Sequence, residues 1–468
     1  MYIWINKGEV EEVNSEHTDA SIFNILDKQT ESNMKSNIEE IWSTLGKKKL
    51  NAINEDLLII ALSIFAVDKR IFRRKFKDCW TRDIQVSIPV IELRKWEIVR
   101  IKLQSILKFL SGDNWIIEFR KTNYRYRNTE EVEELAEKMD FDGVSLFSGG
   151  LDSFSGAIHL LSNNRKICFA GFREYGLLAG RQTKLFEILQ DAYPDTYSKL
   201  ILFNGTPYAP VDEQNNKIDI PPENTSRSRS LLFLAGALGI ASLIGENIPV
   251  YIPENGFIGI NVPLTDSRKG SCSTRTTHPF FVRKLNEILS MVGINNRVEN
   301  FYAFKTKGEI VEEVSNTEAF KRGAGETISC SHPCHARYDE KTPPMNCGYC
   351  YPCIIRKASM NKIGFTSEEY NRDDAISTSF IKEYSKLASR GDDLKAVLWS
   401  LNRYLSNPSE VHIKSLIMQT GELSDEEINK AYRVYVNSME EIKAMVINEA
   451  HKYGKDLLDY VGIEGVDE

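Results

Sequence analysis

The sequence predicts an α/β protein whose centre is an open, mostly parallel, doubly wound sheet. Three observations predict this class. A glycine-rich turn, Ser-Gly-Gly-Leu-Asp-Ser at residues 148–153, joins a short apolar run to an amphipathic segment. Apolar strands then alternate with helical segments as far as residue 302, the pattern of a parallel sheet covered on both faces. Five cysteines lie within residues 330–353, which favours a metal-binding loop over disulfides.

The N-terminal region, residues 1–138, contains neither a phosphate-binding turn nor metal-ligand spacing. Its expected elements are helices over 54–67 and 96–110 and strands over 83–91 and 115–120. Asn54 or Asp56 would cap the first of these helices. The alternation of strands and helices favours an α+β module.

The central domain, residues 139–365, is expected to hold the doubly wound sheet. Its predicted strands cover 144–147, 167–172, 200–203, 250–252 and 298–302. Its predicted helices cover 154–161, 181–192, 227–244 and 280–292. Ligands of such sheets bind at the carboxyl ends of the strands, where the strand order reverses. The turn at 148–153 follows the first strand directly and therefore lies at such an end.

The turn at 148–153 has the chemistry of a phosphate site, because backbone N–H groups and a helix N-terminus favour bound anions. Ser148 and Ser153 add hydroxyl donors, and Asp152 would hold Mg²⁺ or orient the loop. The predicted nucleotide-binding residues are Ser148, Gly149, Gly150, Leu151, Asp152 and Ser153. The turn is not a Walker A loop, since no Gly-Lys-Ser/Thr closes it. The alternative is that its glycines merely close an ordinary turn.

The cysteine cluster has the two-residue gaps of a zinc knuckle. Three of its thiols belong to Cys347, Cys350 and Cys353. Cys330 is the preferred fourth ligand and Cys334 its rival, while His332 and His335 are weaker candidates. Four sulfurs leave no open position for an activated water, so the zinc would be structural. Fortuitous clustering and an iron–sulfur cluster are the alternatives.

Together, the turn and the cysteines, with Arg356-Lys357-Ala358 after them, resemble the 7-cyano-7-deazaguanine synthases (QueC-type enzymes) over about residues 140–365. The resemblance implies an adenine nucleotide alpha-hydrolase-like fold and an ATP pyrophosphatase. Such enzymes adenylate the carboxylate of 7-carboxy-7-deazaguanine, release pyrophosphate and AMP, and transfer the acyl group to ammonia. By position, the loop residues Ser148, Gly149, Gly150, Asp152 and Ser153 match the family's phosphate loop, and Cys330, Cys347, Cys350 and Cys353 match its zinc ligands.

Polar residues after the third predicted strand complete the candidate site. The resemblance places Arg229 in the nucleotide or substrate pocket. Arg275 and Arg268 would neutralise a leaving pyrophosphate, where such catalysis gains most. The predicted catalytic residues are Asp152, Ser153, Arg229 and Arg275. His278 is either a general base or, as favoured, the cap of the helix that begins at Pro279. The stretch 253–279 and the long interval between Cys330 and Cys347 depart from the family.

The regions added at both ends make the chain similar to the larger QueC-like proteins of bacterial anti-phage defence operons, the QatC type. This similarity rests on Asp-Cys-Trp-Thr-Arg-Asp at 78–83 and Ser-Gly-Asp-Asn-Trp at 111–115. It implies a protein partner from the same operon, and the amine acceptor would be either ammonia or a group on a partner macromolecule. Residues 366–468 are expected to be helical, as a cap or partner-docking region.

Composition limits the remaining function classes. The chain has 468 residues, 42% hydrophobic and 27% charged, and a net charge of −7, which does not favour nucleic acid or an anionic membrane. No signal peptide or membrane-spanning run is seen, so a cytoplasmic location is expected. Two alternatives to an enzyme of this type remain. One is a nucleotide-sensing subunit without turnover; the other is nucleic-acid binding or modification, with contacts through residues 69–77 and 120–127.

Overall fold

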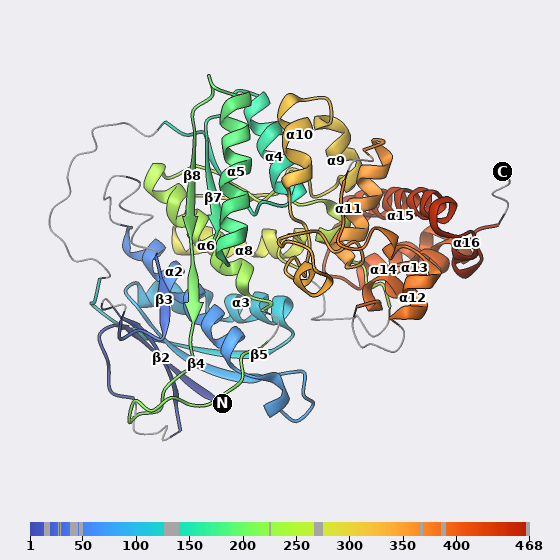
Figure 1. Ribbon diagram of the computed structural model, residues 1–468. Coiled ribbons are helices and arrows are strands. Elements are labelled where there is room, and N and C mark those ends of the chain that lie inside the picture. The colour runs from blue at the N-terminus through green and yellow to red at the C-terminus, as the bar shows by residue number, and fades with distance from the viewer. Residues whose placement is uncertain are drawn as a thin grey trace.

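The protein is α/β, with two parallel sheets and a helical C-terminal region (Figure 1). The computed structural model describes residues 1–13, 19–26, 28, 30–37, 45, 50–125, 140–223, 226–265, 275–365, 368–384 and 390–464. The predicted boundaries after residues 138 and 365 both fall outside the described residues, since 126–139 and 366–367 are not among them. None of the helices in the described ranges is long and apolar enough to cross a bilayer.

The N-terminal sheet has the strand order β2-β1-β4-β5, and all of its neighbouring pairs are parallel. Its strands are β1 (Tyr2–Gly8), β2 (Ser21–Leu26), β4 (Asp83–Val90) and β5 (Asn114–Lys121). Helices α2 (Ala52–Arg70) and α3 (Leu93–Ser111) connect them. Parallel pairing makes this module α/β, where α+β was expected. The predicted cap is also wrong: Asn51 caps α2, and Asp56 instead accepts the amides of Ile91 and Glu92.

The central sheet has the strand order β11-β10-β6-β7-β8, with parallel pairing throughout. Its strands are β6 (Gly143–Leu146), β7 (Ile167–Phe172), β8 (Ser198–Phe203), β10 (Val250–Tyr251) and β11 (Val298–Glu299). Its connecting helices are α4 (Leu151–Ser162), α5 (Gly176–Ala192), α6 (Arg229–Ile244), α7 (Gly256–Ile260) and α8 (Pro279–Val292). The chain runs from β6 outward to β8 and then returns to β10 on the other side of β6. The direction of the strand order therefore changes between β6 and β10.

Different helices cover the two faces of the central sheet. Ile167 and Phe169 of β7 pack into a core with α4 and α5, whereas Cys168, Ala170 and Phe172 pack into a second core with α6 and α8. This second core also contains α2, α3 and the inner face of the N-terminal sheet. A short antiparallel pair, β3 (Met34–Ser36) with β9 (Gly205–Pro207), joins the two modules again. The two sheets thus share one hydrophobic core.

The C-terminal third of the chain, from Lys307 on, is helical and gathers on one side of the central sheet in Figure 1. Its helices are α9 (Lys307–Val314), α10 (Glu318–Gly323), α11 (Tyr351–Lys362), α12 (Thr378–Glu383), α13 (Asp392–Ser406), α14 (Glu410–Met418), α15 (Asp425–Tyr453) and α16 (Asp456–Val461). Helix α15 packs along α11 and α7. A third core joins these helices to Cys347, Cys350 and Cys353.

Candidate functional site

The glycine-rich loop (residues 148–153) lies between the carboxyl end of β6 and the first turn of α4. Gly149 has φ +81°, a conformation that side chains with a Cβ rarely adopt. A Cβ at this position would also lie 3.2 Å from Cγ of the buried Gln182. Gly150 is the extended N-cap of α4. The positive φ therefore favours glycine at 149, and a larger side chain would in addition need Gln182 to shift slightly.

Hydroxyl groups hold the shape of this loop. The Ser148 Oγ accepts the Gly150 amide at 3.2 Å and lies 3.1 Å from the Ser153 Oγ. The Ser153 hydroxyl donates to the Gly150 carbonyl at 2.9 Å. Ser148 is exposed, so it remains accessible to a ligand over the helix N-terminus.

A linking segment (residues 327–330) lies directly against the loop, a contact the sequence did not reveal. The Ile328 amide donates to the Gly149 carbonyl at 2.9 Å. The Leu151 amide donates to the Ser329 Oγ at 3.2 Å. The loop is thus held from outside by a segment about 180 positions further along the chain.

Asp152 is buried beneath the loop in a charged cluster. Its Oδ1 lies 2.6 Å from the Nζ of Lys307, and its Oδ2 accepts the Asn255 side-chain amide at 2.8 Å. The same Asn255 nitrogen donates to Glu254 Oε1 at 3.0 Å. Glu254 and Asn255 follow β10, and Asp152 follows β6, so the cluster lies where the strand order changes direction.

The surroundings of this cluster shift the pKa values of its two carboxyl groups in opposite directions. Burial opposes ionisation of Asp152, but the Lys307 ammonium and several hydrogen bonds hold the pKa of Asp152 below its usual value. Burial, and then the negative charge of Asp152, raises the pKa of Glu254 well above its usual value. Of the two carboxyl groups, Asp152 therefore ionises at the lower pH and Glu254 retains its proton to a higher pH. Both carboxylates could hold a divalent cation, with Glu254 then releasing its proton.

Sequence reasoning missed Lys307. Glu254 and Asn255 lie in the polar stretch 253–279 that the sequence draws attention to, but nothing in the sequence assigns either residue a role of its own. Lys307 is the first residue of α9, where Thr306 and Glu309 form a capping box. That box is a recognisable sequence signal for a helix start, but it does not predict which partner the next residue meets.

Arg229 lies at the first turn of α6, on the same edge of the sheet. Its guanidinium is 2.5 Å from a carboxylate oxygen of Glu174, which follows β7, and it lies over the Phe233 ring at 5.5 Å. Its side chain is 37% exposed, so it is accessible to a ligand. Arg275, by contrast, stacks over the Phe109 ring at 4.9 Å and, among the described residues, has no contact with the glycine-rich loop. Arg268 lies outside the described residues.

His278 is the N-cap of α8, so the capping interpretation is confirmed. Its Nδ1 accepts the Phe280 amide at 3.2 Å, and its Nε2 lies 2.9 Å from the Thr420 Oγ1. Burial, helped by the charges of Arg275 and Arg283, lowers the pKa of His278 to about 3. Because both of its ring nitrogens are engaged in hydrogen bonds in a buried place, this imidazole is better suited to a structural role than to proton transfer.

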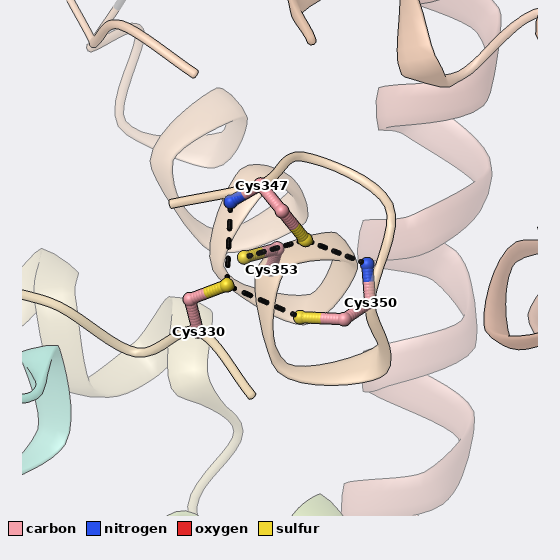
Figure 2. Close-up of side chains that lie close together, drawn as sticks. All are labelled: Cys330, Cys347, Cys350 and Cys353. Carbon is pink, nitrogen blue, oxygen red and sulfur yellow. Dashed lines mark hydrogen bonds between the residues drawn. The ribbon is translucent and has the colours of Figure 1, made fainter. Parts of the chain in front are cut away.

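Four cysteines form the candidate metal centre, and Figure 2 shows their sulfurs converging on one point. They are Cys330, Cys347, Cys350 and Cys353, with all four sulfur atoms within 4.8 Å of one another. The Cys330–Cys350 and Cys347–Cys353 sulfur pairs are 3.8 and 3.9 Å apart. A zinc–sulfur bond of roughly 2.3 Å gives a tetrahedron with edges of roughly 3.8 Å. The spacing therefore fits zinc, and Cys330 is confirmed over Cys334 as the fourth member of the group.

Backbone amides point at these sulfurs, as expected around thiolates. The Cys347 amide donates to the Cys330 sulfur at 3.3 Å, and the Cys350 amide donates to the Cys347 sulfur at 3.3 Å (Figure 2). Burial raises the pKa of the Cys347 and Cys353 thiols, whereas hydrogen bonds from neighbouring thiols lower that of Cys350. Four thiolates can share this buried space only with a cation among them.

The basic segments suggested for nucleic acid have partners within the fold. Arg73 is buried and donates to both carboxylate oxygens of Asp113. Arg120 stacks on Trp4, with its guanidinium 3.4 Å from the ring centroid, and pairs with Glu11. Arg74, Lys75 and Lys77 are exposed.

No protein-family model matches this chain, and the search of curated proteins found no match either.

Proposed function

We propose that this protein binds ATP at the glycine-rich loop and uses it to adenylate a carboxylate, with release of pyrophosphate. The observation that carries the proposal is the place of the loop. It joins β6 to the N-terminus of α4 beside the point where the strand order changes direction, with the Asp152–Lys307 pair directly beneath it. Zinc at the four cysteines would be structural, because four sulfurs fill its coordination sphere.

The strand order supports a doubly wound sheet of the adenine nucleotide alpha-hydrolase type. Its central strand, β6, leads into the loop, and helices from both faces of the sheet begin or end near the carboxyl ends of the strands. The resemblance to 7-cyano-7-deazaguanine synthases rests on the loop and the four cysteines together, and it makes a 7-carboxy-7-deazaguanine-type acid the proposed substrate. A cytoplasmic location and a partner protein from an anti-phage defence operon belong to the same proposal.

The reaction requires a carboxylate oxygen to attack the α-phosphorus while the bond to the β-phosphate oxygen breaks. The helix N-terminus and the Ser148 hydroxyl would bind the phosphates, and Lys307 and Arg229 would offset the charge of the departing pyrophosphate. Asp152 and Glu254 would hold Mg²⁺, which when bound neutralises phosphate charge. An amine, either ammonia or a group on a partner macromolecule, would then displace AMP from the acyl carbon.

Product analysis tests this function. The protein is incubated with ATP, Mg²⁺ and 7-carboxy-7-deazaguanine, with and without ammonium, and AMP, pyrophosphate and new amides or nitriles are followed by mass spectrometry. We expect AMP that depends on the acid. The Asp152→Asn variant should lose this turnover, whereas Asp195→Asn, the same change at an exposed carboxyl on the surface, should retain it.

The alternative outcomes are also informative. ATP that stays bound for hours without AMP, with every acid tried, would favour the nucleotide-sensing subunit. AMP formed only with a protein partner present would place the acceptor amine on that partner. Undiminished turnover in Asp152→Asn would contradict the role given to this carboxylate.

A further inference from the structure

The glycine-rich loop and the cysteine cluster share one stretch of chain. Cys330, a member of the cluster, is the last residue of the linking segment. The two residues before it hold the loop: the Ile328 amide donates to the Gly149 carbonyl at 2.9 Å, and the Ser329 Oγ accepts the Leu151 amide at 3.2 Å. The residue that contacts the first turn of α4, Ser329, is therefore directly adjacent in the sequence to a candidate metal ligand, Cys330.

Residues close in sequence to the other cysteines contact the same segment. Arg356 lies one turn after Cys353 in α11, is fully buried, and donates to the Thr327 Oγ1 at 2.6 Å and to the Ser329 Oγ at 3.4 Å. Asn346, next to Cys347, donates to the Thr327 carbonyl and accepts the Ser329 amide, both at 3.1 Å. The linking segment is thus held at one end by Cys330. Arg356 and Asn346 also connect it to the part of the chain that carries Cys347, Cys350 and Cys353.

We infer that metal binding at the four cysteines and ligand binding at the glycine-rich loop are thermodynamically coupled through the linking segment. Ser329 and Arg356 act as positioning residues in this coupling. With metal bound, the segment keeps the Gly149 carbonyl and the Leu151 amide in place, so the loop is already arranged for an anion. Without metal, Cys330 is released and the loop loses this support. The part of the inference that concerns ATP rests on the proposed function.

Hydrogen exchange tests the coupling without any nucleotide. In the metal-loaded protein, Ser329→Ala should speed exchange at the Leu151 amide about fivefold, because one net hydrogen bond is lost. Ser329→Thr retains the hydroxyl and should restore the slow rate. Metal content is measured in both variants and should stay at one ion per chain. Removal of the metal from the wild-type protein should speed exchange across residues 149–153, while the amides of β7 serve as an internal reference.

Nucleotide binding supplies the second readout. Because coupling between two bound ligands is reciprocal, Mg·ATP should raise the affinity for zinc by the same factor by which zinc raises the affinity for Mg·ATP. In Ser329→Ala this factor should fall toward one. Loop exchange that is the same in wild type, Ser329→Ala and the metal-free protein would overturn the inference. Faster loop exchange without metal, together with no ATP binding to the loaded wild type, would uphold the link between the metal and the loop and overturn the proposed function and ATP as the coupled ligand.

Discussion

Asp152 and Lys307 neutralise each other beneath the glycine-rich loop, although they are 155 positions apart in the sequence. The motif at 148–153 predicts Asp152 as a site residue, because loops of this kind place a carboxylate at a helix N-terminus. Nothing local predicts Lys307, since the ion pair exists only once β6 and the turn before α9 have met. The same limit applies to Glu254, whose pKa is raised by burial and by the charge of Asp152, which is about 100 positions earlier in the chain, at the start of α4.

Loss of Lys307 tests this ion pair. Lys307→Met is expected to lower the free energy of unfolding by about 3–5 kcal/mol, because it leaves a buried carboxylate without its counter-charge. The double variant with Asp152→Asn should recover most of that loss. Urea unfolding followed by circular dichroism measures the wild type, Lys307→Met, Asp152→Asn and the double variant. If the losses in free energy of unfolding of the two single variants simply added in the double variant, the interaction between Asp152 and Lys307 would be contradicted.

His278 gives a pH dependence with a defined sign. Its pKa in the folded protein is about 3, below its ordinary value of 6.5, so the unfolded chain binds a proton that the folded protein does not. Stability contributed by this residue is therefore complete above about pH 6.5 and is lost as the pH falls, at up to roughly 1.4 kcal/mol per pH unit. His278→Asn, which retains an N-cap acceptor, should show a shallower loss between pH 6.5 and 5. Parallel stability profiles for the two proteins would rule out the assignment.

At the scale of elements, apolar periodicity predicts the central sheet well and its irregular ends poorly. The strand predicted at 167–172 is confirmed at both ends as β7. Helix α5 begins at Gly176, five residues before the prediction, because two glycines and an exposed leucine hide its first turn. The strand predicted at 298–302 ends at Glu299, where the Asn300 side chain accepts the Tyr302 amide and turns the chain. The linking segment has no periodic signal at all.

The metal centre is tested at Cys330 and Cys334. Cys330→Ser should reduce bound zinc well below one ion per chain and lower the melting temperature, because a structural zinc contributes directly to folding. Cys334→Ser is the matched control, since this thiol lies four positions away and outside the four-sulfur group. Zinc content by elemental analysis decides between them. Zinc loss in the Cys334 variant alone would reverse the ligand assignment.

At the scale of the whole molecule, the N-terminal module and the central sheet behave as one folded body, because they share a hydrophobic core and a buried ionic network. Asp68, at the end of α2, pairs with Arg82 and accepts the amides of Arg227 and Ser228 just before α6. Arg82 also pairs with Asp113. The sequence draws attention to the motifs at 78–83 and 111–115, but only the fold shows that both lie together near the start of α6.

Disruption of this network should destabilise both modules together. Asp68→Asn is expected to lower the free energy of unfolding by about 3–5 kcal/mol, since it leaves buried arginines short of a counter-charge. Unfolding of the variant, followed by tryptophan fluorescence and by circular dichroism, should remain coincident. Asp195→Asn, at an exposed carboxyl, should leave the stability within about 0.5 kcal/mol. Two separate transitions in the variant would contradict a shared core.

The measurement that tests the central claim most directly is calorimetric titration of an uncleavable α,β-methylene analogue of ATP, with Mg²⁺, into the wild type and Gly149→Ala. Gly149 adopts φ +81° beside Gln182, so a methyl group there must distort the loop. We expect the wild type to bind the analogue and the variant to bind at least about tenfold more weakly, in line with the cost of a left-handed backbone for alanine. Equal affinities in the two proteins, or no binding to the wild type, would contradict the assignment of a nucleotide to this loop.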